Sequence, residues 1–306
     1  MERAIRNKKN KEIGKLLFYI GLLVIPLIQF AVFYVYVNIN SVMLAFEKYD
    51  MQSGFSFAGF ENFSMIFKNF SEDSIFRGAF TNTLLVLVLG LVIGTTLPVL
   101  VSYYIYKKRP FGNFFRVVLF LPSILSTLVL VIAYKYFCEV AVPEIWFKLF
   151  DKEIEGLLYG TDVSRSFFFV IFYCYWFGAG SSFLLYISTM SSISDSITEA
   201  ANLDGFSPFQ EFIFITLPLI FPTYTTFVVL NISVLFSNQL NLYSIYAEYA
   251  PNDMFTVGYY MYKETVVAGF EKYPYLAALG IFCTAIVVPL CLIIKRAMEK
   301  YGPSTD

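Results

Sequence analysis

Long apolar runs alternate along the chain with shorter segments that hold most of the charges. Six runs contain no acidic residue and are long enough to cross a bilayer: about 16–38, 84–106, 114–137, 166–190, 213–238 and 275–294. A helix needs about 20 apolar residues, at 1.5 Å per residue, to cross roughly 30 Å of hydrocarbon. The pattern therefore predicts an all-α integral membrane protein with six transmembrane helices.

Two of these runs carry residues that interrupt a plain apolar helix. The third holds Arg116 and Lys135 only near its ends, where long cationic side chains can reach the lipid headgroups. The fifth holds Pro218 and Pro222, which predict a kink that neighbouring helices accommodate. In the second run, the spacing of Gly90 and the glycine four residues later permits close helix packing.

The distribution of Lys and Arg predicts the topology. More than half of the 22 lie at the two ends of the chain and in the connection 107–116. Positive residues are retained on the cytoplasmic side, so we expect both termini in the cytoplasm. The first run is too long for a signal peptide and should remain as an anchor. The expected division is a cytoplasmic N-terminus (1–15), a first transmembrane helix (16–38), an extracytoplasmic segment (39–80), a core of five transmembrane helices (81–294) and a cytoplasmic C-terminus (295–306).

Composition excludes several classes of function. The chain is 58% hydrophobic and 15% charged, has a net charge of −1 and contains no histidine. Such a charge disfavours nucleic-acid binding, and the missing imidazole removes the usual general base and metal ligand. Gly14-Lys15 lacks the glycine and the hydroxyl of a phosphate loop. We therefore expect a protein that is not an enzyme, with no cofactor of its own, and interpret the four separated cysteines as small apolar helix residues.

One connection on the predicted cytoplasmic side, 191–212, lacks positive charge. Ser196 followed by Glu199 has the spacing of a capping box, which predicts a short helix over 197–205 that ends at Gly205. Ser207, with proline next and glutamine at the third position, is a second helix start. The segment is thus predicted to form a helix, a glycine turn and a second helix, although an ordinary interfacial loop is the alternative on these signals alone.

The same segment resembles a family motif. Glu199-Ala200-Ala201, Gly205 and Ile215-x-Leu217-Pro218 reproduce the EAA motif of permease subunits in binding-protein-dependent ABC importers. The resemblance implies the type I ABC importer permease fold, with 197–205 as the cytoplasmic coupling helix. It also implies that the coupling residues contact a separate ATPase subunit: Glu199, Ala200, Ala201, Asp204 and Gly205.

Other segments resemble the carbohydrate branch of this family, similar to the maltose and glycerol-phosphate permeases. They are Gly59-Phe60-Glu61-Asn62-Phe63, Asn82-Thr83, Arg116 and Phe120-Leu121-Pro122-Ser123. The segments 195–198 and 249–252 depart from the usual pattern. The resemblance implies a sugar or oligosaccharide as solute, a second and related permease chain, an ATPase dimer that binds ATP and magnesium, and an extracytoplasmic solute-binding protein.

Candidate solute contacts lie in the fourth and fifth runs. Asn231, Leu235 and Asn238 have a spacing that places two amides on one helical face, which should point to protein or water rather than lipid. Such amides can bind sugar hydroxyls, and hydrogen bonding between helices is an equal alternative. Weaker candidates in the fourth run are Trp176, Gly178 and Ser181.

Three other readings of the chain as a whole stay open. The first is an ion-coupled secondary transporter, which the acid-free runs disfavour without excluding it. The second is an ABC importer for a solute other than a sugar. The third is a membrane scaffold with no transport role, which the complete motif disfavours.

Overall fold

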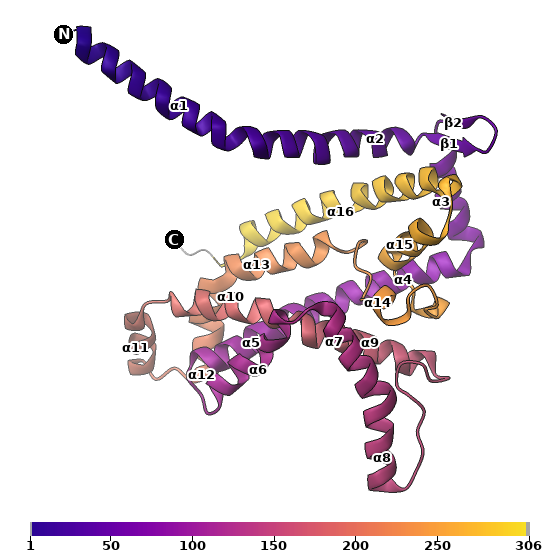
Figure 1. Ribbon diagram of the computed structural model, residues 1–306. Helices are drawn as coiled ribbons and strands as arrows, with labels where there is room; N and C mark the ends of the chain where they lie inside the picture. Colours follow the sequence, from indigo (N-terminus) through magenta and orange to yellow (C-terminus); the bar gives the residue numbers. More distant parts are fainter. Residues whose placement is uncertain (1, 304–306) are drawn as a thin grey trace. The chain divides into compact units, whose positions relative to one another are not determined.

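The computed structural model describes residues 2–303, with side chains from residue 12 onward, and is built almost entirely of helices (Figure 1). Within residues 2–303, five helices are long and apolar enough to cross a membrane, and a sixth candidate is bent. This confirms the predicted all-α membrane class. The five are Glu12–Leu44, Ser74–Tyr106, Val163–Ser191, Pro208–Ser233 and Phe270–Tyr301. The basic side chains before residue 12 and residues 304–306, which entered the topology prediction, lie outside the described part.

The chain forms two compact units. The first contains the residues up to Ile66 together with Gly269–Phe282, and the second contains Phe67–Ala268 with Cys283 onward. In the first unit a long helix is followed by a small antiparallel hairpin that the sequence pattern did not predict, with Asp50 opposite Gly54. The elements are α1 (Glu2–Phe30), the π-helical turn η1 (Ala31–Tyr36), α2 (Val37–Leu44), β1 (Glu47–Asp50), β2 (Gly54–Phe57), the start of α3 (Glu61–Glu72), η6 (Phe270–Lys272) and the start of α16 (Tyr273–Tyr301).

Asn62 ties the hairpin to α3. Its buried side-chain amide donates hydrogen bonds to the carbonyl oxygens of Ala45 (2.9 Å) and Glu47 (2.8 Å). Gly59, at φ +60°, makes the left-handed turn that brings α3 back onto the hairpin, a conformation that costs glycine little. The segment 59–63, which is one of those that resemble the family, therefore holds α3 against the hairpin.

In the second unit, the helix Ser74–Tyr106 consists of α4 (Ser74–Leu89), the π-helical turn η2 (Gly90–Gly94) and α5 (Thr95–Tyr106). It begins ten residues before the predicted run because the Asp73 side chain caps it, accepting from the backbone of Ile75 and Phe76. Asn82 and Thr83 bind the loop before α15, through the carbonyls of Asp253 and Phe255 and the N–H of Val257. α9 (Val163–Gly178) and α10 (Gly180–Ser191) follow, and α10 packs on α5, α6 and α13.

The third predicted span is not one straight helix. α6 (Gly112–Ile124) ends two residues after Pro122, and a new helix starts after Ser126 at an angle of 108°. Leu125 and Ser126 between them are extended (ψ 150° and 132°). Proline has no N–H for the helix ladder, which weakens this turn. The second arm comprises α7 (Thr127–Tyr136), the π-helical turn η3 (Phe137–Ala141) and α8 (Val142–Phe150).

The fifth predicted span runs from Pro208 to Ser233, so its predicted end at residue 238 was wrong. Absence of charge cannot distinguish helix from irregular backbone that other parts of the protein cover. Pro218 follows a wide π-helical turn, which relieves the clash of its ring with the preceding turn. The elements are α12 (Pro208–Glu211), η4 (Phe212–Thr216) and α13 (Leu217–Ser233), followed by α14 (Leu242–Tyr246), η5 (Asn252–Met254) and α15 (Val257–Val267).

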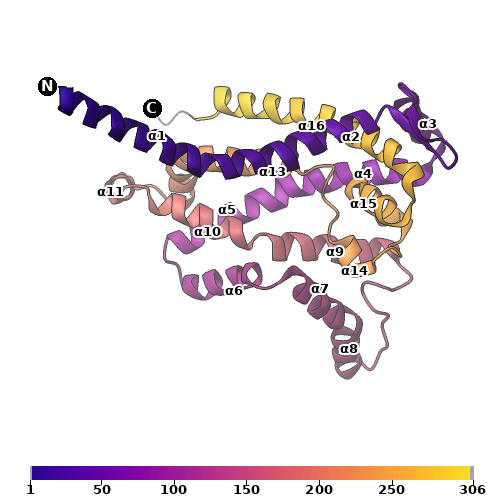
Figure 2. The same ribbon diagram turned by 45° about the horizontal axis from the view of Figure 1, so that its top comes forward.

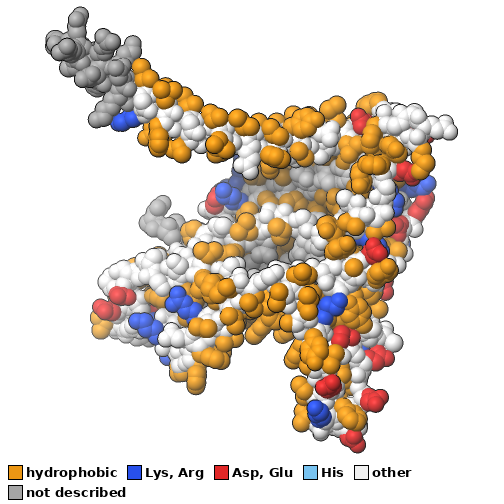
Figure 3. Space-filling model, viewed as in Figure 1, with side chains coloured by type: hydrophobic (Ala, Val, Ile, Leu, Met, Phe, Trp, Pro, Cys, Tyr) orange, Lys and Arg blue, Asp and Glu red, His pale blue; other side chains and the backbone are white. Residues whose placement is uncertain are grey.

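A different set of helices lies at each end of the second unit. α11 (Asp195–Leu203), α12 and the C-terminal end of α5 gather at one end, while α8, α14 and α15 lie at the other (Figures 1 and 2). Figure 3 shows charged side chains concentrated at these ends and apolar side chains dominating between them. This is the distribution that a bilayer requires.

Replacing Asn62 by Ala should destabilise the hairpin of the first unit. The change leaves the carbonyls of Ala45 and Glu47 without their partner, which costs about 1–3 kcal/mol. Hydrogen exchange of the β1 and β2 amides should become faster. Ser64→Ala, at an exposed position of the same helix, is the matched control, and equal protection in both variants would contradict the role of Asn62.

Candidate functional site: a surface helix and a polar cavity

α11 is a short helix of nine residues at one end of the second unit. It begins at Asp195 after Ser194, two residues earlier than predicted. The predicted capping box was therefore wrong, because Ser196 lies inside the helix, where its hydroxyl is 2.7 Å from that of Ser194. The helix itself is present, and Asp195 in its first turn suits the positive end of the helix dipole.

The end of α11 and the start of α12 follow the predicted turn chemistry. Gly205 has φ +76°, its N–H donates to Asn202, and the next N–H, of Phe206, donates to Ala201 (3.0 Å), which completes a Schellman motif. Ser207 and Gln210 form the reciprocal capping box of α12. The helix, glycine turn and second helix predicted from the sequence are thus confirmed.

The predicted coupling residues differ in exposure. Glu199, Ala200, Asp204 and Gly205 are exposed, whereas Ala201 is 3% exposed and faces the rest of the chain. Ala201 therefore helps to seat the helix on the body of the second unit.

Two large, exposed apolar side chains that the sequence analysis did not single out lie in α11 and α12. Leu203 is 88% exposed and Phe209 is 69% exposed. The nine residues of the short helix give no clear periodicity, so the sequence did not mark Leu203 as an outward-facing position. In the folded chain these two side chains offer apolar surface beside the acidic groups of α11.

The end of α5 holds this segment in place. The Tyr103 hydroxyl donates to the carbonyl of Pro208 (2.7 Å), and the Tyr106 hydroxyl is 3.5 Å from that of Thr198. Below them lies an apolar cluster of Val99, Tyr186, Met190, Phe212 and Ile220. The second span is therefore joined to the surface helix through Tyr106 and to the start of the fifth span through Tyr103.

A polar cavity of about 300 Å³ opens between these spans and α9–α10. Of the candidate solute contacts, Gly178, Ser181, Asn231 and Asn238 line it. A neighbouring lobe of about 290 Å³ shares Gly178 and two further wall residues with it. The shared residues missing from the prediction are Cys174 and Asn241.

The predicted helical face that carries both amides is not present in the fifth span. Leu235 and Asn238 lie beyond the end of α13, so the three proposed positions do not share one helical face. Asn231 donates to its own helix at Phe227 (3.0 Å), and Asn238 accepts from the N–H of Leu240 (2.9 Å). Both of these hydrogen bonds are local, and both amides also border a third, small cavity that Leu235 lines.

Trp176, the remaining candidate, is 46% exposed, and its ring stacks on that of Phe172 outside the cavity walls described above. Tyr175, its neighbour, was missed although it lines the cavity, and its hydroxyl donates to the carbonyl of Val86. Adjacent residues of a helix point in different directions, and in an all-apolar run nothing marks the inner one.

Gly90 and Gly94, the glycine pair predicted to permit close packing, lie beside side chains of the cavity wall. A Cβ atom at Gly90 would lie 3.2 Å from the Asn231 side-chain oxygen, and one at Gly94 would lie 3.2 Å from the Tyr175 ring. The two glycines make room for the polar side chains of the cavity wall.

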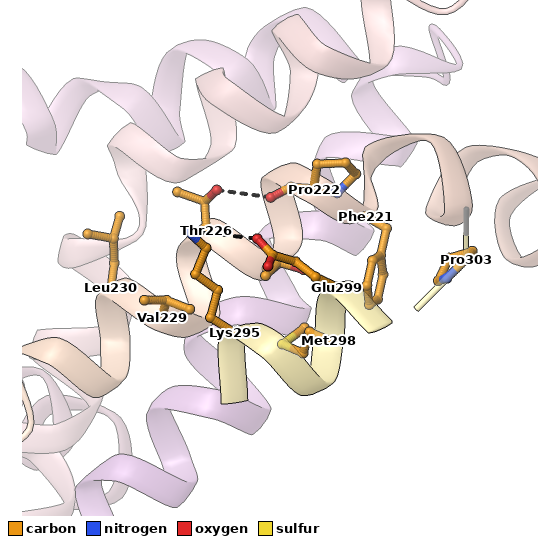
Figure 4. Close-up of a pocket in the computed structure, with 10 residues that line it drawn as sticks. Phe221, Pro222, Thr226, Val229, Leu230, Lys295, Met298, Glu299 and Pro303 are labelled. Atoms are coloured by element: carbon orange, nitrogen blue, oxygen red, sulfur yellow. Dashed lines mark hydrogen bonds and ion pairs between the residues drawn. The ribbon is translucent and has the colours of Figure 1, made fainter. Parts of the chain in front are cut away.

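A separate and larger cavity, about 560 Å³, lies between α13 and the C-terminal end of α16 (Figure 4). Pro222, Thr226 and Leu230 form one wall, and Met298 and the exposed Lys295–Glu299 ion pair form the other. It borders a different set of α13 residues from the polar cavity, which keeps the two cavities distinct.

The comparisons with known proteins agree with this architecture. Residues 86–305 match the family model of the binding-protein-dependent transport system inner membrane component. The chain therefore belongs to this family. It is a membrane transport subunit rather than an enzyme, as the sequence predicted.

Similar proteins include the multiple sugar-binding transport system permease protein MsmF of Streptococcus mutans, 28% identical over 203 residues, covering 66% of this chain and 68% of MsmF. The arabinooligosaccharides transport system permease protein AraP of Bacillus subtilis is 24% identical, covering 90% and 86%. A chain of a bacterial alginate ABC transporter, solved with an alginate pentasaccharide-bound periplasmic protein, superposes with a TM-score of 0.80 at 21% identity, covering 95% and 96%. The predicted permease fold is thereby confirmed.

Filling the polar cavity should stop transport without unfolding the chain. A Cβ atom at Gly178 meets nothing within 4 Å, so the side chain of Gly178→Leu can extend into the cavity without a clash. We expect normal amounts of the variant in the membrane and loss of solute uptake in cells that depend on it. Gly78→Leu, which also has open space but lies outside the cavity wall, should transport normally. Equal uptake by both variants would remove this cavity from the solute path.

Proposed function

We propose that the chain is the permease subunit of an ATP-driven importer of a sugar or oligosaccharide, and that α11 docks on a separate ATPase subunit. The observation that carries the proposal is the exposed surface of α11, with Glu199, Asp204 and Leu203, on a helix that a side-chain contact joins to the second span and a tight turn connects to the fifth. A partner that pushes on this helix acts directly on the transmembrane bundle.

The cavity chemistry supports a hydroxyl-rich solute. Asn231, Asn238 and Asn241 offer amides, Ser181 a hydroxyl, and Tyr175 an aromatic ring. Amides and hydroxyls bind sugar hydroxyl groups in both donor and acceptor roles, and aromatic rings pack on apolar sugar faces. Two of the relatives described above carry sugar or oligosaccharide transport in their names.

The distribution of basic residues supports the orientation. Lys107, Lys108 and Arg109 lie at the end of α5 beside α12, the same end as α11. The C-terminal end of α16 reaches the start of α13, because a Cβ at Gly302 would collide with the Phe221 ring. We assign this end to the cytoplasm by the positive-inside rule, which gives cytoplasmic termini in a prokaryotic cell membrane.

The partners follow from the division of labour in such an importer. ATP and magnesium bind to a dimer of ATPase subunits, a second permease chain completes the pore, and an extracytoplasmic binding protein delivers the solute. Closure of the ATPase dimer displaces α11, and the tight Gly205 turn passes the movement to the helix Pro208–Ser233, which carries the wall residue Asn231. The cavity then opens alternately to the two sides.

Leu203→Asp should release the ATPase. The change puts a charge where a well-exposed apolar side chain meets the partner, while the chain itself loses no buried contact. Affinity purification of the tagged permease from membranes should recover less ATPase subunit with this variant, and Glu199→Lys should have the same effect. Leu149→Asp, at a 70% exposed position on α8 at the other end of the unit, should retain the ATPase fully.

The solute class is tested separately. The purified complex is supplied with its binding protein and a panel of neutral and acidic mono- and oligosaccharides, and ATP hydrolysis is measured. Stimulation by at least one saccharide is expected. Stimulation by a non-sugar solute alone would replace the sugar assignment and leave the transport mechanism in place, whereas a permease that never co-purifies with an ATPase would remove the proposal entirely.

A further inference from the structure

An ion pair connects the second span to the start of the fifth. The Lys107 ammonium lies 2.9 Å and 2.8 Å from the two carboxylate oxygens of Glu211. The Glu211 side chain is 3% exposed and that of Lys107 is 17% exposed. By contrast, the Lys68–Glu72 and Lys295–Glu299 pairs each lie within one helix and are more than half exposed.

Burial makes this pair a strong geometric constraint. A desolvated carboxylate is strongly disfavoured without a partner, so separation of the two side chains is opposed more than separation of an exposed pair. The bonds between Tyr103 and Pro208 and between Tyr106 and Thr198 lie on the same helix end, beside Lys107. α5 is therefore joined to α11 and to α12, on both sides of the Gly205 turn.

The same long helix reaches the cavity. The helix Ser74–Tyr106 ends at the residue before Lys107. The cavity-lining Gly94 lies about three turns earlier in the same helix. Gly94 packs on the Tyr175 ring, and Gly90 packs on the Asn231 side chain. A movement imposed at Lys107 is thus imposed on a helix that forms part of the cavity wall.

We propose that the Lys107–Glu211 ion pair is the joint that makes the helix Ser74–Tyr106 follow the displacement of α11. The inference rests on the proposed function, because it assumes that an ATPase displaces α11. Movement then reaches the cavity through two helices, Ser74–Tyr106 and Pro208–Ser233. Lys107 and Glu211 are positioning residues, since they act on the cavity through the helices that carry them.

The test measures the movement directly and needs no knowledge of the solute. Spin labels are attached through ketone-bearing residues introduced at Leu100 on α5 and Ile293 on α16, both exposed, which leaves the four cysteines in place. Pulsed electron paramagnetic resonance then gives the distance between the labels in the permease–ATPase complex, without nucleotide and after trapping with ATP and vanadate. The wild-type distance should shift on trapping.

K107M should lose this shift while the ATPase still co-purifies, because α11 remains exposed. K107M/E211L should behave in the same way without leaving a buried charge, and the charge swap K107E/E211K should restore the shift. K295M breaks an exposed pair by the same substitution and should keep the full shift.

A full shift in either K107M or K107M/E211L would overturn the proposal, and so would a wild-type distance that does not change on trapping. If K107M fails to assemble, the assembled double variant and the charge swap decide, and a swapped pair that assembles without the shift also overturns it. Failure of the wild-type chain to co-purify with an ATPase is a separate result, which removes the proposed function itself.

Discussion

Hydrocarbon offers no hydrogen-bonding partner to the peptide backbone, and this constraint organises the second unit. Backbone can leave the helical conformation at membrane depth only where protein or water covers it. The chain leaves it inside two predicted spans, at Leu125–Ser126 and after Ser233. Both breaks border the polar cavity and its lobe, through Leu125 at one and Asn238 and Asn241 at the other. The interruptions of the helices and the position of the cavity therefore have the same physical cause.

Polar side chains within the spans obey the same constraint. The Tyr175 hydroxyl donates to the carbonyl of Val86, the Ser102 hydroxyl to that of Phe183 (3.1 Å), and the Cys174 thiol to that of Leu240 (3.2 Å). Each bond joins two segments and satisfies a donor that lipid could not. At the end that we assign to the cytoplasm, a buried charge takes the place of these neutral groups. There Lys107 forms an ion pair with Glu211, where the surface helix meets the bundle.

The sequence predicted the helices better than their ends. Apolar composition located the spans, because a bilayer demands a minimum apolar length. It placed the fifth end five residues too late and did not detect the 108° bend after Pro122, because a buried turn and a buried helix have the same composition. Turn chemistry was more exact around Gly205: this glycine and the Ser207 cap act as predicted, since each depends on a neighbour only a few residues away, whereas the capping box predicted at Ser196 was wrong.

Local chemistry along the chain was thus enough to establish the membrane class, the surface helix with its glycine turn, and the family resemblance, because apolar length, capping and motif spacing all act over short stretches. Packing in three dimensions alone established that Ala201 is buried and Leu203 exposed, that Tyr175 rather than Trp176 borders the cavity, and that Lys107 meets Glu211. These contacts join residues from separate helices, and which faces of uniformly apolar helices meet is determined by the fit of their side chains.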